Sequence, residues 1–185
     1  MIVSEFISLD GVVEAPGGEP GHPHTGWVFA YHGPEIEAYK LRELQEAEAM
    51  LLGRITYEGF AEAWPSRTGE LANRLNAMPK LVVSSTIGSP LTWANATVLA
   101  ADPVPAVTEL KRDDDGPILV HGSATLAREL LEADLVDELR LMVFPVLVGG
   151  GKGLFPTSYR KATFTLAGSE PVLPDVVALT YSRAA

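Results

Sequence analysis

The chain has 185 residues, no cysteine, and 14 basic against 24 acidic side chains, which gives a formal net charge of −10. A typical domain has about 150 residues, so the length predicts a single domain over residues 1–185. The 46% hydrophobic content is enough for a packed core and excludes wholesale disorder. The acidic balance argues against a nucleic-acid partner. The absence of cysteine excludes disulfides, thiol nucleophiles and cysteine-ligated zinc.

Nothing in the hydropathy points to export or to a membrane. The first residues show neither the basic nor the apolar region of a secretory signal. The longest uncharged apolar run, residues 141–151, has 11 residues, whereas a helix that crosses a bilayer needs about 20. We therefore expect a cytoplasmic protein without membrane contact.

The predicted elements begin with a buried strand at residues 2–8, which are rich in Ile, Val and Phe. Residues 12–34 are dense in Gly and Pro and predict a long loop, which suits a lid. Within it, Trp27 and Phe29 are placed to fold over a bound substrate.

Beyond this loop, helical and strand patterns alternate. In chain order they predict a helix over 35–50, a strand over 49–52, a helix over 55–63, strands over 81–85 and 96–99, a helix over 103–112 with a turn at 113–116, a strand over 118–120, a helix over 123–132, and strands over 139–148, 162–167 and 176–182. This order indicates a three-layer α/β fold with a mixed, mostly parallel central sheet flanked by helices.

Three predicted strands end in small or hydroxyl-bearing residues that lead toward a helix or a turn. In α/β sheets, ligands bind outside the carboxyl ends of the strands. A glycine there lets the backbone approach a ligand, and the helix that follows offers N–H groups to a phosphate. Arg54 adds a cation suited to phosphate oxygens, and Ser84, Ser85 and Thr86 add hydroxyl groups.

These strand ends also carry a family resemblance. Residues 53–58 resemble the Gly-Arg-x-Thr-(Trp or Tyr)-Glu motif of dihydrofolate reductases, and residues 81–85 are similar to their Ile-Val-Leu-Ser strand. Residues 118–141 resemble their strand, Gly-Gly or Gly-Ser turn, helix and returning strand. Residues 8–11 and 144–151 are closer to a sister group, the C-terminal reductase domain of the bifunctional riboflavin-biosynthesis deaminase/reductase. The resemblance covers residues 1–182.

In that family NADPH lies across the sheet, and the resemblance implies which residues hold it here. Gly53, Arg54 and Thr56 hold phosphate groups. Ser84, Ser85 and Thr86 face the adenosine ribose and its 2′-phosphate. The pyrophosphate and the nicotinamide side contact Gly122, Ser123, Ala124 and Leu126. Thr86 stands where the family often has arginine, so NADH is the alternative cofactor.

The substrate side offers fewer candidates. Asp10 matches the riboflavin-type Ser-Leu-Asp-Gly and is the candidate proton donor, for which burial must raise its pKa; the alternative is a cap on the following turn. Glu37 lies 16 residues before Gly53, an offset similar to that of the dihydrofolate reductase carboxylate, and has no role if it faces solvent. The loop histidines His22, His24 and His32 match no zinc motif, so we expect no metal.

The resemblance implies an NADPH-dependent reductase that transfers a hydride to a small heterocyclic or ribosylamino-pyrimidine-type substrate, similar to 5-amino-6-(5-phosphoribosylamino)uracil reductase. The alternatives are a nucleotide- or flavin-binding protein of the same fold with little turnover, and a dihydrofolate reductase proper. We also expect a homodimer, and a purely structural dimer joined through residues 144–153 is a further alternative.

Overall fold

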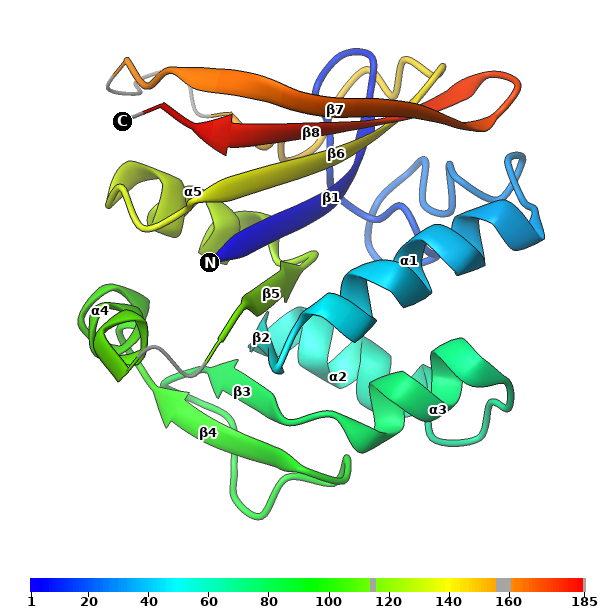
Figure 1. Cartoon of the computed structure of the whole chain (residues 1–185). Helices are drawn as coiled ribbons and strands as arrows, with labels where there is room; N and C mark the ends of the chain where they lie inside the picture. The colour runs from blue at the N-terminus through cyan, green and yellow to red at the C-terminus, as the bar shows by residue number, and fades with distance from the viewer. Residues whose placement is uncertain (114–115, 156–160, 185) are drawn as a thin grey trace.

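The computed structural model describes residues 1–113, 116–155 and 161–184, and these form one eight-stranded sheet in the order β4-β3-β2-β5-β1-β6-β8-β7 (Figure 1). Neighbouring strands from β4 to β6 run parallel, whereas β8 is antiparallel to both β6 and β7. The predicted mixed, mostly parallel sheet is therefore confirmed. The strands are β1 Ile2–Ser8, β2 Ala49–Gly53, β3 Lys80–Val83, β4 Ala96–Ala100, β5 Ile118–His121, β6 Glu138–Phe144, β7 Phe164–Leu173 and β8 Val176–Arg183.

Five helices within the described residues cover the two faces of this sheet. They are α1 Pro34–Glu46, α2 Arg54–Ala63, α3 Glu70–Ala77, α4 Pro103–Asp113 and α5 Ala124–Glu132. The alternation of side chains along β1 shows the two layers, because Ile2 packs in one core cluster with α1, α2 and α3 while Val3 packs in the other with α4 and α5. We call these sides the α1 face and the α5 face; the figure shows the two groups of helices on opposite sides of the strands (Figure 1).

Several predicted boundaries are wrong at the carboxyl ends of strands. β6 ends at Phe144 rather than at residue 148, because Pro145 has no N–H group to donate to the sheet. β3 ends at Val83, so the serines that follow lie in a turn. The α5 helix begins at Ala124 because Ser123 has a left-handed backbone, with φ of 67°.

Other predictions differ in length or in number. The predicted helix at 35–50 ends at residue 46, and β7 runs to residue 173 rather than 167. The helix α3 was missed, although its buried Ala72 and Leu75 lie three residues apart on one face. Part of the turn expected at 113–116 lies outside the described residues. No helix in the described part of the chain is long and apolar enough to cross a membrane.

A buried lysine fixes the start of β3. Lys80 Nζ donates hydrogen bonds to the carbonyls of Asn76, Met78 and Ala94 at 3.0, 2.8 and 2.9 Å. The same ammonium group lies 4.3 Å from the centre of the Trp93 ring. Burial lowers the pKa of Lys80 to about 8. The ammonium therefore ties the end of α3 to the loop before β4.

Replacing this lysine with an apolar residue of similar length tests the tie. Lys80→Met leaves three carbonyls without their donor, so we expect it to lower the free energy of unfolding by about 3 kcal/mol. Urea denaturation followed by circular dichroism measures this loss. The exposed Lys161→Met is the control and should change the stability by less than about 0.5 kcal/mol. Equal stability of the two variants would contradict the role of Lys80.

Candidate cofactor site at the carboxyl edge of the sheet

Three adjacent parallel strands, β3, β2 and β5, end at the same edge of the sheet. Gly53 ends β2 directly opposite Val83, the last residue of β3. On the other side of β2, Gly122 and Ser123 follow the end of β5. The structure thus brings together the predicted cofactor residues that come from these three separate stretches of sequence.

The turns that follow the neighbouring strands β2 and β5 contact each other. The Gly53 N–H group donates a hydrogen bond of 2.9 Å to Ser123 Oγ, and a Cβ atom on Gly53 would lie 3.4 Å from the Ser123 side chain. Gly122 has φ of 65°, and a Cβ atom there would lie 3.3 Å from Thr56 Cγ2. A Cβ atom at Gly53 would thus be in ordinary van der Waals contact, whereas at Gly122 the left-handed backbone and the close Thr56 methyl group favour glycine.

Two helices start from these turns, α2 after Gly53 and α5 after Ser123. Within the described residues neither helix has a side-chain cap on its first N–H groups. Unpaired N–H groups and the positive end of the helix dipole favour an anion. Because the two helix starts adjoin at one edge, the arrangement suits two linked phosphates, and we call this pair of helix starts the cradle.

Polar side chains surround these helix starts. The Arg54 guanidinium is 42% exposed and pairs with Glu58, one helical turn on, at 2.9 Å. Ser84 Oγ accepts hydrogen bonds from the N–H groups of Thr86 and Ile87, at 3.1 and 3.0 Å, so this hydroxyl closes a turn. Ser85 and Thr86 are exposed. The hydroxyl groups of Ser85 and Thr86 are therefore the ones open to a ligand.

One predicted cofactor residue belongs to the core instead. Leu126 is buried on the α5 face, in the cluster that contains Val3 and Leu130. It lies beneath the cradle, since a Cβ atom on Gly53 would be 4.0 Å from Leu126 Cβ. The side chain of Leu126 therefore supports the turn from below, while Ala124, at the start of α5, is only partly buried.

β1 and β5 part beyond their third residue pair, and we call this break in the pairing the slot. β1 pairs with β6 over residues 2–8 but with β5 only over residues 2–4, where Ser4 lies opposite His121. The Ser4 carbonyl accepts from the Gly122 N–H group at 3.5 Å, so it points toward β5. By strand alternation the backbone N–H and C=O of Phe6 point the same way, beyond the last residue pair.

Two buried polar atoms lie where these strands part, on opposite faces of the sheet: the Glu5 side chain is on the α5 face, whereas His121 packs against Phe60 of α2 on the α1 face. Glu5 Oε1 and His121 Nδ1 have no hydrogen-bond partner among the described residues. Burial raises the pKa of Glu5 to about 8, against the charge of Lys40 and with a small contribution from Glu19. Burial, together with Lys40, lowers the pKa of His121 to about 3. Both groups are therefore uncharged near neutral pH. Sequence reasoning missed both, although a glutamate within an apolar strand was a visible signal.

A buried ion pair between Lys40 and Glu43 lies on the α1 face of β1. Lys40 Nζ donates to Ser4 Oγ at 2.7 Å and to Glu43 Oε2 at 2.9 Å, and it lies 4.7 Å from the centre of the Phe6 ring. This ion pair joins α1 to the central strand. Glu37, on the same helix, is exposed, which is the condition under which it has no role.

Asp10 has the contacts of a turn cap. Its carboxylate accepts hydrogen bonds from Ser8 Oγ at 2.6 Å and from the N–H groups of Val148 and Gly149 at 3.1 and 2.8 Å. These bonds, with Ser8 as the largest cause, lower the pKa of Asp10 to about 2. Asp10 therefore does not meet the condition for a proton donor, which is a raised pKa. Asp10 is ionised at neutral pH and holds the glycine-rich segment after β6 against β1.

The predicted lid residues have different surroundings. Trp27 is buried, its indole N–H donates to the Glu14 carbonyl at 2.9 Å, and its ring meets Phe144 edge-on at 5.7 Å. This aromatic side chain therefore belongs to a core under the loop. Phe29 is 62% exposed and lies over Gly26.

No cluster of three or more His, Asp or Glu side chains able to hold a metal occurs in the parts of the chain described.

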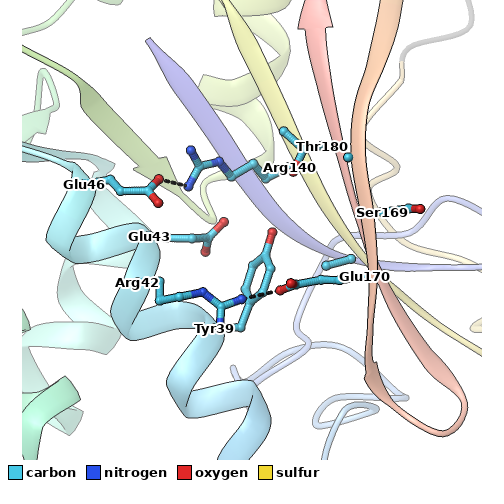
Figure 2. Close-up of a pocket in the computed structure, with 10 residues that line it drawn as sticks. Tyr39, Arg42, Glu43, Glu46, Arg140, Ser169, Glu170 and Thr180 are labelled. Carbon is cyan, nitrogen blue, oxygen red and sulfur yellow. Dashed lines mark hydrogen bonds and ion pairs between the residues drawn. The ribbon is translucent and has the colours of Figure 1, made fainter.

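A separate cavity of about 300 Å³ lies between α1 and the strands β7 and β8 (Figure 2). Its charged side chains pair across the opening: Arg42 with Glu170, and Arg140 with Glu46 at 2.7 Å. The close-up shows both ion pairs between the helix and the strands (Figure 2). Because the cavity lies along the second half of α1 and its charges are neutralised, we do not place the cofactor there.

Comparison with known proteins gives a consistent result. The RibD C-terminal domain family matches residues 1–178. Two proteins of Bacillus subtilis (strain 168), both uncharacterized, are similar. YyaP is 24% identical over 189 residues, covering 98% of this chain and 93% of the relative. YwjB is 25% identical over 180 residues, covering 96% and 94%.

Solved structures share the fold. A candidate riboflavin biosynthesis protein from Shewanella sp. PV-4 superposes with a TM-score of 0.76 and 22% identity, over 100% of this chain and 98% of that one. RibD of Acinetobacter baumannii gives a TM-score of 0.70 and 16% identity, with 100% of this chain matching 58% of that protein.

The buried carboxyl of Glu5 predicts a pH-dependent stability. Glu5 of the folded chain holds its proton up to about pH 8, whereas in the unfolded chain it loses the proton near the ordinary glutamate pKa of 4.5. Stability should therefore fall as pH rises through this window. Glu5→Gln removes this dependence, so we expect the variant to be more stable than the wild type at pH 8 by on the order of 3 kcal/mol, but not at pH 5. Urea midpoints at both pH values measure this, and parallel pH curves would contradict it.

Proposed function

The chain belongs to the RibD C-terminal domain family, a family of reductase-like domains of riboflavin biosynthesis, and from this premise we propose that it is an NADPH-dependent reductase. It transfers a hydride to a small heterocyclic substrate of the ribosylamino-pyrimidine type. The observation that carries the proposal is the meeting of the α2 and α5 helix starts at Gly53 and Gly122. This cradle has the geometry that a pyrophosphate needs.

The slot between β1 and β5 supports the nicotinamide end of the proposal. A nicotinamide carboxamide has one acceptor oxygen and one donor N–H₂ group, and the backbone of Phe6 offers an N–H and a C=O together. The orphaned Glu5 Oε1 and His121 Nδ1 give the slot further polar atoms in need of a partner. When bound there, NADPH supplies a hydride from C4 of its ring, while the strands orient it and exclude water.

The substrate side rests on the loop that covers residues 12–34. His22 Nε2 lies 3.0 Å from the Gly150 carbonyl, and the Lys152 N–H group donates to Glu14 at 2.8 Å. With Asp10, these contacts hold the loop against the glycine-rich segment. We propose that Phe29 is the loop's contact with the substrate, and that Asp10 acts by positioning. Folate reduction is disfavoured because Glu37 is exposed.

Steady NADPH oxidation with a pyrimidine or quinone-like acceptor distinguishes a reductase from a binding protein with little turnover.

The expected homodimer also remains a prediction. Leu147 and Phe155 are 73% and 55% exposed beside the glycine-rich segment, and self-association would cover them.

The cradle predicts how charge at the start of α2 controls NADPH affinity. Arg54→Ala removes the guanidinium and should weaken binding about tenfold at low salt. Glu58→Gln should strengthen binding, because it removes a carboxylate and releases Arg54 from its ion pair. Quenching of Trp fluorescence on titration with NADPH measures both.

The matched control is Arg112→Ala. It changes the net charge by the same amount as Arg54→Ala, but Arg112 is exposed in the last turn of α4. Its affinity should equal that of the wild type. If Arg54→Ala and Arg112→Ala bind NADPH alike, the cradle is not the phosphate site.

The turn after β3 predicts the choice between NADPH and NADH. Ser85 and Thr86 offer hydroxyls but no cation to a 2′-phosphate, so the wild type should prefer NADPH only weakly. Thr86→Arg adds a guanidinium there and should raise the NADPH affinity about tenfold while leaving NADH unchanged. Parallel titrations with both cofactors test this, and an equal gain for NADH would place the 2′-phosphate elsewhere.

A further inference from the structure

Glu5 has an environment that packing alone does not explain. Its side chain is 3% exposed, and Oε1 has no hydrogen-bond partner in the part of the chain that the structure describes. A buried polar atom without a partner is costly, and an apolar residue would fit the strand better. The neighbours of Glu5 on the same face of β1, Val3 and Ile7, are apolar and belong to one core cluster.

Its place in the strand puts the carboxyl beside the slot. Glu5 is the first residue of β1 beyond the pair Ser4–His121, and it lies opposite Leu141 of β6. On the β5 side, Gly122 turns away into the cradle. The carboxyl group therefore lies where the strands part, next to the Phe6 backbone that we assign to the nicotinamide carboxamide.

The charged and titratable groups near Glu5 come from α1, from the loop and from β5. Lys40 of α1 acts on Glu5 with a positive charge, and Glu19 of the loop with a negative one. Lys40, which is also in a buried ion pair with Glu43, lowers the pKa of Glu5, but burial has the larger effect. His121 of β5 lies on the opposite face of the sheet, against Phe60, and is neutral near pH 7. The apolar surroundings therefore decide the protonation of Glu5, which favours the carboxylic acid.

We propose that Glu5 is a catalytic acid of the reduction, which holds the proton that accompanies the hydride and releases it when the nicotinamide becomes cationic. The proposal rests on the proposed function, because it requires NADPH in the slot. A positive ring beside a buried carboxyl stabilises the carboxylate. Hydride transfer thus itself drives the release of the proton.

The step balances for a C=N acceptor. The C4–H bond of the dihydronicotinamide breaks with its electron pair, and a new C–H bond forms on the acceptor carbon. The O–H bond of Glu5 breaks, and a new N–H bond forms on the acceptor nitrogen. NADPH is oxidised to NADP⁺, the C=N bond is reduced to an amine, and the Glu5 carboxylate regains its proton from water after product release.

A binding experiment tests this without a substrate. NADP⁺ carries the cationic ring and NADPH the neutral one, and their phosphates are the same. At pH 7 the wild type should release close to one more proton on binding NADP⁺ than on binding NADPH. Calorimetric titrations in buffers of different ionisation enthalpy count these protons. Glu5→Gln should abolish the difference, whereas the exposed Glu109→Gln on α4 should retain it.

The infrared spectrum of the free wild-type protein gives a second reading. It should show the carbonyl stretch of a protonated carboxylic acid at pH 7, and this band should be missing from Glu5→Gln. If both cofactors bind but release equal numbers of protons, or the difference survives in Glu5→Gln, or the band is absent, this proposal is overturned and the proposed function stands. If the wild type binds neither cofactor, the proposed function fails and this proposal falls with it.

Discussion

The close approach of β2 and β5 at their carboxyl ends is the constraint on which the rest of the site depends. A single hydrogen bond, from the Gly53 N–H group to Ser123 Oγ at 2.9 Å, joins the two turns, and Gly122 leaves room for Thr56 beside them. A side chain at Gly122 would strain its left-handed backbone and press on Thr56 at the start of α2. The proposed pyrophosphate cradle therefore depends on the glycine at Gly122 and on the Gly53–Ser123 hydrogen bond.

The electrostatics of the site follow from burial rather than from net charge. The chain carries a net charge of −10, so a cofactor with several phosphates meets an unfavourable overall field. Helix starts and one guanidinium act over short distances and offset that field locally. In the slot, burial keeps Glu5 and His121 uncharged near neutral pH, and the buried Lys40 is paired with Glu43. The interior of the proposed site is therefore polar but nearly uncharged.

The sequence predicted the sheet and the cradle because both depend on local signals. Apolar strands and glycine at strand ends are visible in a single chain, so Gly53 and Gly122 were placed correctly at one edge. Burial and hydrogen bonding depend on tertiary contacts and could not be predicted. The structure therefore shows two unpredicted features. Asp10 is ionised and accepts hydrogen bonds from the N–H groups of Val148 and Gly149, and Trp27 is buried. The role of Glu5 depends on where β1 and β5 part, which no local pattern shows.

A crystal structure of the chain with NADPH tests the central claim most directly. The account predicts the pyrophosphate against the first turns of α2 and α5, and the nicotinamide between β1 and β5 with its carboxamide on the Phe6 backbone. Well-defined NADPH in the cavity between α1 and β7–β8, or on any surface away from Gly53 and Gly122, would contradict it.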